Sequence, residues 1–564
     1  MDEQTISTSE ESMAPTPAKA KAKRKAKAMP KAKKRSNARR VAEGDGNERG
    51  RIAKCARQRE ERAHSPSMSE QTSKSDHEEQ CPLPDVKTNS TDSESEIGAI
   101  ELGGGETSAA FPASSGLIDY ATWLVQNLTL DEIQRLQDRW PTTYAELCAG
   151  MGSGTMALRA LQKALCDHGI VVQNECTFVT ETCAWKRKAL QQLLKGHGTD
   201  FFIRTGDLSC GTVAMDQHGT AKVRPKCDLI FMGIACVDIS NLSSTPKSLR
   251  DSDDGASAKS FQELLDYLWA LDKTDRPRAI IIECVKSLMH VRKRGLAKPE
   301  RGVDLVSEKL TEAGYVGRWM ALNAKRFLLP ASRHRAWGIF LKQGDGSEDM
   351  VGNAASRITA LQMKQHEQLA AILTRCNDSK SAKPHKQRSP SLSNPDCDTS
   401  IKKHAQGWVK KHGSFAKRAR LSREDLHAED LIAFRQLAEG TLGQREIDAT
   451  CLRLAELKKK GSLEDWREAP HLIITVGASL KRIEICQLAF PCVLPKMRYA
   501  LLCNGEVTLA TGPMCLAMQG VQRQELVEFP QLLKLSGTRQ QDLAGNAFAA
   551  NVCAAVTLMV LLAI

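Results

Sequence analysis

The chain has 564 residues, of which 41% are hydrophobic and 26% charged, and its formal net charge is +13 at pH 7. A chain of this size and composition can bury at least one large core, which excludes a wholly disordered protein. Eighteen cysteines would suit an extracellular disulfide framework, but the chain is long and its start, MDEQTISTSEESM, lacks the apolar core of a secretion signal.

We therefore expect reduced cysteines and a location in the cytosol or nucleus. No Cys-x-x-Cys pair occurs in the sequence, and no group of His and Cys has the spacing of zinc ligands. The sequence therefore predicts no metal site.

Residues 1–112 are rich in Ser, Thr, Glu, Lys and Pro and poor in aromatics, so we expect them to be disordered. Almost all of the net charge lies within residues 19–40, which hold twelve Lys or Arg and no acid. Such a run is either a solubilising end or a segment for nuclear import or attraction to phosphate. We expect a nuclear protein on this basis.

Apolar residues three and four apart predict a first helix at 117–140. Short apolar runs then alternate with helical ones, as a parallel sheet with crossover helices requires. The expected strands are 143–148, 177–181, 227–233, 278–284 and 336–342, and the expected helices are 154–168, 184–195, 258–272 and 302–313. This pattern predicts a doubly wound, Rossmann-like α/β domain over 113–342 whose ligand lies at the carboxyl ends of the strands.

A smaller inserted region is expected over 343–510. It contains a helical segment, a polar linker at 378–400, two amphipathic helices within 422–460, and strands with a hairpin turn at Asn504-Gly505. Residues 511–564 are expected to return to the first domain. The last eighteen residues carry no charge and could just span a bilayer, but we expect a buried core helix and no membrane.

Three strand ends carry residues suited to a cofactor. A glycine-rich turn, CAGMGSG at 148–154, follows the first strand, and glycines there let the backbone approach a ligand. Glu181 ends the second strand, where an acid commonly accepts both hydroxyls of a ribose, and Asp207 offers another acid. Together they suggest an adenosine-containing cofactor, although the glycines lack the full dinucleotide spacing.

A second set of residues is suited to catalysis. Cys236 lies three residues beyond Gly233 in a segment that turns polar, which favours a reactive thiol over a packing residue. Glu283 ends the neighbouring strand, while Arg333 and Arg335 are two apart and face one side of a strand.

In order, these motifs resemble those of the DNA (cytosine-5) methyltransferase family, of which this chain looks like a divergent member. The matching elements are CAGMG at 148–152, Glu181, Ala235-Cys236, Glu283-Cys284-Val285, ASRHR at 331–335 and GNAF at 545–548. The resemblance implies S-adenosyl-L-methionine as the cofactor, with the insertion as target-recognition region and DNA as the partner. The cofactor-binding residues it implies are Cys148, Gly150, Met151, Gly152, Glu181, Asp207, Asn546 and Phe548.

The resemblance also implies a mechanism on a cytosine that is rotated out of the duplex. Cys236 would add to ring position 6, and Glu283 would act at N3 of the ring. Arg335 would contact O2 of the base and Arg333 would help to hold the loop.

Four positions depart from the family pattern. They are Ala235 for the usual proline, Val237 for glutamine, Cys284 for asparagine and Ala331 for glutamine. Ala235 would loosen the loop and Cys284 would lose an amide that holds it. We expect an active enzyme; the alternatives are a transfer-RNA cytosine-5 methyltransferase and a catalytically degenerate protein that binds nucleic acid.

Overall fold

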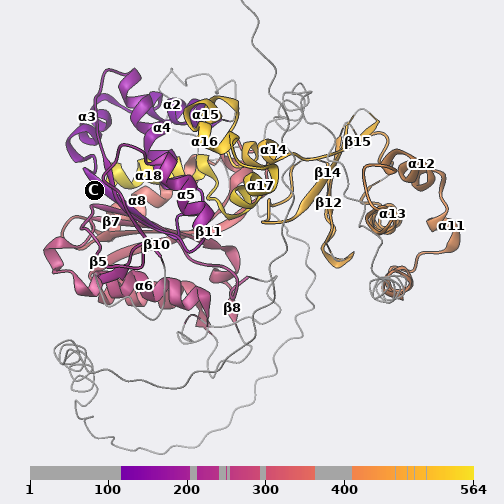
Figure 1. Ribbon diagram of the computed structural model, residues 1–564, viewed down its shortest axis with the longest axis horizontal. Helices are drawn as coiled ribbons and strands as arrows, with labels where there is room; N and C mark the ends of the chain where they lie inside the picture. The colour runs from indigo at the N-terminus through magenta and orange to yellow at the C-terminus, as the bar shows by residue number, and fades with distance from the viewer. Residues whose placement is uncertain are drawn as a thin grey trace, which may run out of the picture. The chain divides into compact units, whose positions relative to one another are not determined.

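A seven-stranded sheet forms the centre of the first domain, with the strand order β10-β11-β7-β6-β1-β2-β3 (Figure 1). Five neighbouring strands run parallel to one another, namely β7, β6, β1, β2 and β3. The strands β11 and β10 are antiparallel to their neighbours. The strands are β1 Thr143–Leu147, β2 Glu175–Thr180, β3 Asp200–Phe202, β6 Leu229–Gly233, β7 Ala279–Val285, β10 Tyr315–Asn323 and β11 His334–Lys342. The predicted doubly wound α/β fold is confirmed.

The computed structural model describes residues 116–203, 213–240, 249, 255–292, 300–362, 410–463, 465–469, 471–478, 480–487, 489–503 and 505–564. The expected disordered tail at 1–112, the linker at 378–400 and Asp207 lie outside these residues.

Two cores cover the two faces of the sheet, because neighbouring residues of a strand point to opposite sides. Tyr144 belongs to one core and Ala145 to the other. Figure 1 shows α6 below the sheet and α4 and α18 above it. The helices of this domain are α2 Leu117–Gln126, α3 Leu130–Arg139, α4 Ser153–Asp167, α5 Ala184–Leu193, α6 Ala256–Ala270, α7 Gly302–Glu312, α8 Glu348–Ala360 and α18 Ala550–Ala563.

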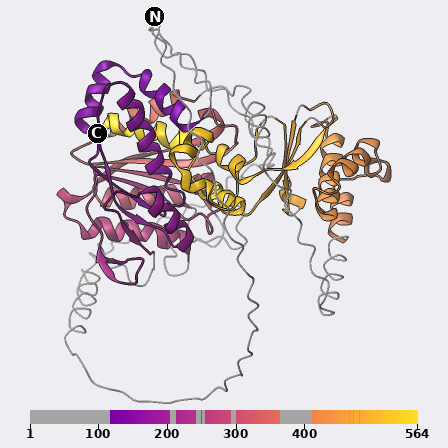
Figure 2. The same cartoon turned by 45° about the horizontal axis from the view of Figure 1, so that its top comes forward.

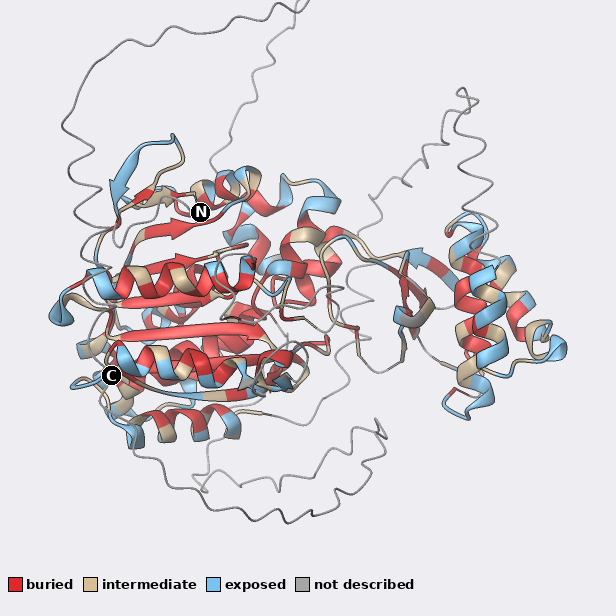
Figure 3. Ribbon diagram, turned by 90° about the horizontal axis from the view of Figure 1, so that it is seen from below, coloured by how far each residue is buried: buried red, intermediate tan, exposed pale blue. Residues whose placement is uncertain are grey.

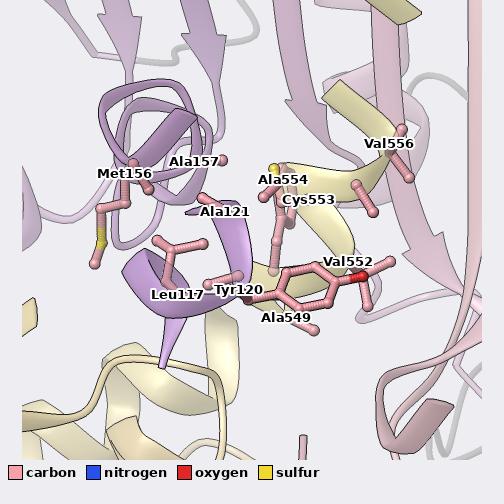
Figure 4. Packing of buried hydrophobic residues seen from close by; sticks show 14 of the residues in the cluster. Leu117, Tyr120, Ala121, Met156, Ala157, Ala549, Val552, Cys553, Ala554 and Val556 are labelled. Carbon is pink, nitrogen blue, oxygen red and sulfur yellow. The ribbon is translucent and has the colours of Figure 1, made fainter. Parts of the chain in front are cut away.

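The apolar C-terminal segment is a core helix. In α18, Val552 and Cys553 are buried beside Leu117 and Tyr120 of α2, as Figure 4 shows. Among the described residues, Gly537–Ala563 is a helical stretch long and apolar enough to cross a membrane, yet 94% of its most apolar window is buried within the protein. Other parts of the protein therefore cover the apolar surface of this segment.

The structure differs from the expected elements in two places. The single helix expected at 117–140 is two helices. The Thr129 side chain accepts the N–H of Glu132, and the Glu132 carboxylate accepts the N–H of Thr129, so that a capping box begins a new helix, α3. β3 and β10 were not predicted, since β3 is very short and the burial pattern of β10 is irregular along its length. The helix α8, which follows the expected boundary at 343, packs on α18 and β10.

The inserted region has its own sheet and its own core (Figures 1 and 3). The sheet order is β13-β12-β14-β15, all antiparallel. Cys503 pairs with Glu506 across a two-residue turn in which Gly505 has φ +75°, as a hairpin requires; Asn504 lies outside the described residues. Its elements are α11 Arg423–Leu426, α12 Glu429–Ala438, α13 Gln444–Lys459, β12 His471–Val476, β13 Ile485–Cys486, β14 Arg498–Cys503 and β15 Glu506–Leu509.

Four helices lead from this sheet back to α18 (Figure 2). They are α14 Gly512–Ala517, α15 Arg523–Glu528, α16 Pro530–Leu533 and α17 Gly537–Asn546. Two small hairpins complete the described part of the chain, formed by β4 Val213–Met215 with β5 Ala221–Val223 and by β8 Val291–Arg292 with β9 Glu300–Arg301.

Candidate active site

The strand order reverses between β1 and β6, and the carboxyl ends of β1, β2, β6 and β7 meet at one edge of the sheet. Ligands of open α/β sheets bind at this kind of switch point. Most of the residues that the sequence singled out follow these strand ends.

The glycine-rich turn has the conformation that its glycines permit. Cys148, Gly150 and Gly152 have φ of 56°, 57° and 81°, the left-handed region. A Cβ on Gly152 would lie 2.6 Å from Cδ2 of Leu193 in α5, so that side chain would have to move, and the φ of 81° strains any residue that carries a side chain. The chain therefore turns sharply from β1 into α4.

Glu181 lies at the tip of β2, as predicted, and is 8% exposed. Its carboxylate accepts the N–H of Gly150 at 3.0 Å and the N–H of Cys183 at 2.8 Å. Each carboxylate oxygen has two lone pairs. Glu181 therefore holds the glycine turn and keeps acceptor capacity for a ligand.

The C-terminal segment meets this turn. The carbonyl oxygen of Asn546 would lie 3.2 Å from a Cβ on Gly150, and the ring of Phe548 would lie 3.2 Å from a Cβ on Gly233. The side chain of Asn546, however, donates to the carbonyl of Asp542 within α17. Asn546 thus faces the turn with its backbone carbonyl, and its side chain bonds within α17. Its role in binding the cofactor stays a prediction.

Met151, another predicted cofactor residue, is buried, at 3% exposed. It lines a small cavity with Met156, Leu190 and Leu543, which are apolar. It packs the turn against the neighbouring helices.

Cys236 is exposed on the segment after β6, residues 234–240, which we call the nucleophile loop. The N–H of Ala235 donates to Oγ of Ser260 at 3.1 Å, a bond that proline could not make. The N–H of Ile234 donates to the carbonyl of Glu283, and the thiol of Cys284 makes a long contact of 3.8 Å with the carbonyl of Ile234. Hydrogen bonds thus replace part of the stiffness that the departures from the family pattern remove.

Glu283 and the two arginines converge beside this loop. Arg335 Nε lies 3.0 Å from Glu283 Oε1, and Arg333 Nη2 lies 4.0 Å from the same oxygen. Although the first distance is short, the N–H is not aimed at the oxygen, which has no hydrogen-bond partner. The oxygen is buried, and the two guanidiniums are its charged neighbours.

The charged groups of this cluster affect the pKa of the Cys236 thiol. Desolvation by the surrounding protein raises the pKa of the Cys236 thiol, although its side chain is exposed, and the Glu283 carboxylate adds to the rise. Arg335 and Arg333 oppose the shift without cancelling it. Cys236 therefore rests as a thiol and has to lose its proton when it attacks.

Arg333 is 3% exposed and connects three parts of the chain. Its guanidinium donates to the carbonyl of Ala547 at 2.6 Å and to that of Val493 at 3.2 Å. It therefore joins β11 to the inserted region and to the segment that follows α17. These hydrogen bonds go to the inserted region and to the C-terminal segment, and the role predicted for Arg333 in holding the nucleophile loop stays a prediction.

Sequence reasoning missed two residues. Cys492 lies between the two guanidiniums, 3.7 Å from Arg333 Nη1 and 3.6 Å from Arg335 Nη2, and its only signal was a Pro-Cys dipeptide outside the order of the motifs. Glu146 is buried in β1, and its carboxylate accepts both the N–H and the hydroxyl of Thr155 at the start of α4. A lone acid inside an apolar strand was the signal for Glu146.

The doubly wound sheet, the glycine turn and the acid after β2 define an α/β fold with a candidate ligand site at its switch point. A thiol beside an acid and two arginines narrows the class of protein further. The model of the C-5 cytosine-specific DNA methylase family matches residues 142–456, more than half of the chain. The chain belongs to this family.

Two curated relatives are similar to the chain. The DNA (cytosine-5-)-methyltransferase DMT5 of Cryptococcus neoformans is 22% identical over 432 residues, which are 72% of this chain and 16% of that protein. The type II methyltransferase M2.BsuMI of Bacillus subtilis is 26% identical over 148 residues, 25% of this chain and 35% of that protein. The chain thus matches well under two thirds of the length of either relative.

Solved structures of methyltransferases match this chain with low TM-scores and low sequence identity. The S. pombe Dnmt2 methyltransferase has a TM-score of 0.35 at 12% identity, covering 74% of this chain and 98% of that one. The Entamoeba histolytica methyltransferase EhMeth has a TM-score of 0.38 at 14% identity, covering 74% and 97%.

Proposed function

We propose that this protein transfers a methyl group from S-adenosyl-L-methionine to carbon 5 of cytosine in DNA, through a covalent adduct on Cys236. The observation that carries the proposal is the convergence of Glu283, Arg335 and Arg333 beside the nucleophile loop. The family relation supports cytosine-5 methyl transfer in general, and the two relatives named above are a DNA methyltransferase and a type II methyltransferase by name.

The residues around the glycine turn fit an adenosine-containing methyl donor. Gly150 and Gly233 let the backbone of Asn546 and the ring of Phe548 lie close to the turn, and Glu181 keeps acceptor capacity at the tip of β2. The ring of Phe548 provides an apolar surface at the same edge. S-adenosylmethionine supplies an electrophilic methyl group when bound.

The chain's own residues activate the base. The sulfur of Cys236 loses its proton and bonds to carbon 6, and the π electrons of the 5,6 double bond move onto carbon 5, which becomes nucleophilic. After carbon 5 has gained the methyl group, its proton leaves, the double bond returns and the carbon–sulfur bond breaks. The thiolate then takes up a proton, so the enzyme is restored.

Charge that develops on the ring is stabilised by groups already in place. Glu283, which lies beside Arg335, is proposed to share a proton with N3 of the base. Arg335 places positive charge toward O2 of the base, at little cost in reorganisation, because Glu283 and Cys492 already hold it. Arg333 acts by holding the C-terminal segment and Val493 in place.

Double-stranded DNA hides carbon 6 within the stack, so the target base has to rotate out of the duplex. The inserted region is proposed to recognise the DNA, and its basic run at 401–423 to contact phosphates. Arg420 and Lys459 lie together in the described part of this region, since the Lys459 ammonium donates to the carbonyl of Arg420.

Covalent trapping tests the proposal. The full chain is incubated with methyl donor and duplex DNA that contains 5-fluorocytosine, where position 5 cannot lose a proton and an active thiol stays attached. We expect an adduct with wild type and none with Cys236→Ser, while Cys166→Ser, at another exposed cysteine, traps as wild type does. Trapping of tRNA alone would refute the DNA substrate, and trapping by Cys236→Ser would refute the nucleophile.

We further propose that the protein acts in the nucleus and that residues 19–40 direct it there, because their charge suits import or binding to phosphate. Fluorescence imaging of a fusion with and without these residues tests this. Equal nuclear signal in both would assign the basic run another role.

A further inference from the structure

A second cysteine belongs to the arginine cluster. The Cys492 sulfur is within hydrogen-bond distance of both guanidiniums, at 3.7 Å from Arg333 Nη1 and 3.6 Å from Arg335 Nη2. We propose that Cys492 is a positioning residue whose thiolate accepts hydrogen bonds from Arg333 and Arg335 and orients Arg335 toward the target base. This inference rests on the proposed function, because that function gives Arg335 its role.

The backbone fixes the sulfur in this place. Two residues before Cys492, Phe490 donates to the carbonyl of Pro330 at 2.7 Å and accepts the N–H of Ser332 at 2.8 Å. The hydroxyl of Tyr499 then donates to the carbonyl of Cys492 at 3.0 Å. The inserted region is thus tied directly to the residues that precede β11, and Cys492 is held from both sides.

The charge balance of the cluster favours a thiolate. Arg333 otherwise bonds to neutral carbonyl oxygens, and Glu283 is a single carboxylate for two guanidiniums. Burial alone would raise the pKa of the Cys492 thiol, but Arg335 and Arg333 lower it below the ordinary value. The Tyr499 phenol also faces Cys492. Burial raises the pKa of Tyr499 and the charge of Cys492 adds to the rise, so the phenol stays neutral.

The two thiols of the site therefore differ in state. Arg335 faces Cys492, Glu283 and Cys236; burial alone would lower its pKa, but these three acids raise it. Cys236 has a raised pKa and reacts, whereas Cys492 carries the charge and holds the arginine. Protonation of Cys492 would loosen Arg335 without touching the cofactor turn.

Thiol labelling tests the charge state without any methylation assay. Wild-type protein is treated with iodoacetamide across pH 6 to 9, and labelling at each cysteine is followed by mass spectrometry. Cys486 is the control, because it is also half-buried in the inserted region and burial raises its pKa to about 11. We expect Cys492 to be labelled at least roughly tenfold faster at neutral pH, and more slowly in Arg335→Gln. Labelling of Cys492 no faster than that of Cys486 would overturn the proposal.

Substitution tests the positioning role. We expect Cys492→Ala to lower kcat of DNA methylation roughly tenfold, since two charge-assisted hydrogen bonds are lost, with unchanged binding of S-adenosylmethionine. Cys492→Asp restores a negative charge and should recover much of kcat, with the acidic limb of the pH profile moved to lower pH. Cys486→Ala should match wild type.

Equal kcat and pH profile in Cys492→Ala and Cys486→Ala would contradict the inference, as would a 5-fluorocytosine adduct on Cys492 itself. If wild type methylated no cytosine substrate, the proposed function would fail, while labelling would still decide the charge state of Cys492. If Cys492→Ala did not fold, labelling of the wild type and the Cys492→Asp profile would decide.

Discussion

The buried carboxylate of Glu146 makes the stability of the fold depend on pH. Glu146 lies in β1 and bonds to Thr155 at the start of α4, and desolvation raises its pKa from 4.5 to about 7, although the hydrogen bonds from Thr155 oppose the rise. Between these two values the folded chain keeps a proton that the unfolded chain releases. Stability from this group is therefore full below pH 4.5, falls as pH rises to about 7, and then stays constant.

A shift of this size corresponds to about 3 kcal/mol. Glu146→Gln removes the titration, so the free energy of unfolding of the variant should rise relative to that of wild type, by that amount, between pH 4.5 and 8. Urea denaturation at a series of pH values measures this difference, and Glu506→Gln, at an exposed position of β15, controls for the chemistry of the substitution. Parallel pH profiles for wild type and Glu146→Gln would show that the carboxylate is ionised throughout and refute the reasoning.

Three further substitutions test the contacts that hold the site together. Gly545→Ala should lower Tm by several degrees, because its Cβ would lie 2.2 Å from the backbone nitrogen of Pro495, while Gly413→Ala meets nothing within 4 Å; equal Tm values would mean that these segments separate freely. Arg333→Lys should cost on the order of 3 kcal/mol in urea denaturation, because lysine cannot reach several carbonyls at once, and wild-type stability would contradict its holding role. Ser260→Ala should slow 5-fluorocytosine trapping several-fold with a loss of only about 1 kcal/mol in stability, since the nucleophile loop loses a tie; an unchanged trapping rate would show that the loop needs no such support.

Local pattern was enough for most of the sheet and for the chain order of the site. Strands β1, β2, β6, β7 and β11 were predicted within a few residues, because buried parallel strands are short apolar runs that end in turn residues. Their carboxyl ends must share an edge in a parallel sheet, so the sequence could place Glu181, Cys236 and Glu283 together. The family resemblance added Arg333 and Arg335 from their spacing.

Contacts between segments far apart in the chain could not be predicted from local sequence patterns. β10 pairs with β11 at the edge of the sheet, where half-open residues leave little periodic signal. The tie from Ala235 to Ser260 could not be foreseen either, since the sequence showed only the loss of a proline.

The sequence by itself determined the fold class and the family, and it predicted the reactive groups, since these depend on residue type and on short-range order. Only the tertiary structure decided that Arg333 binds the carbonyls of Val493 and Ala547, and that Cys492, 159 residues from Arg333, carries a sulfur to both arginines. The physical reason is that charge state and hydrogen bonding depend on distance in space and on burial, which chain order does not specify for an inserted region.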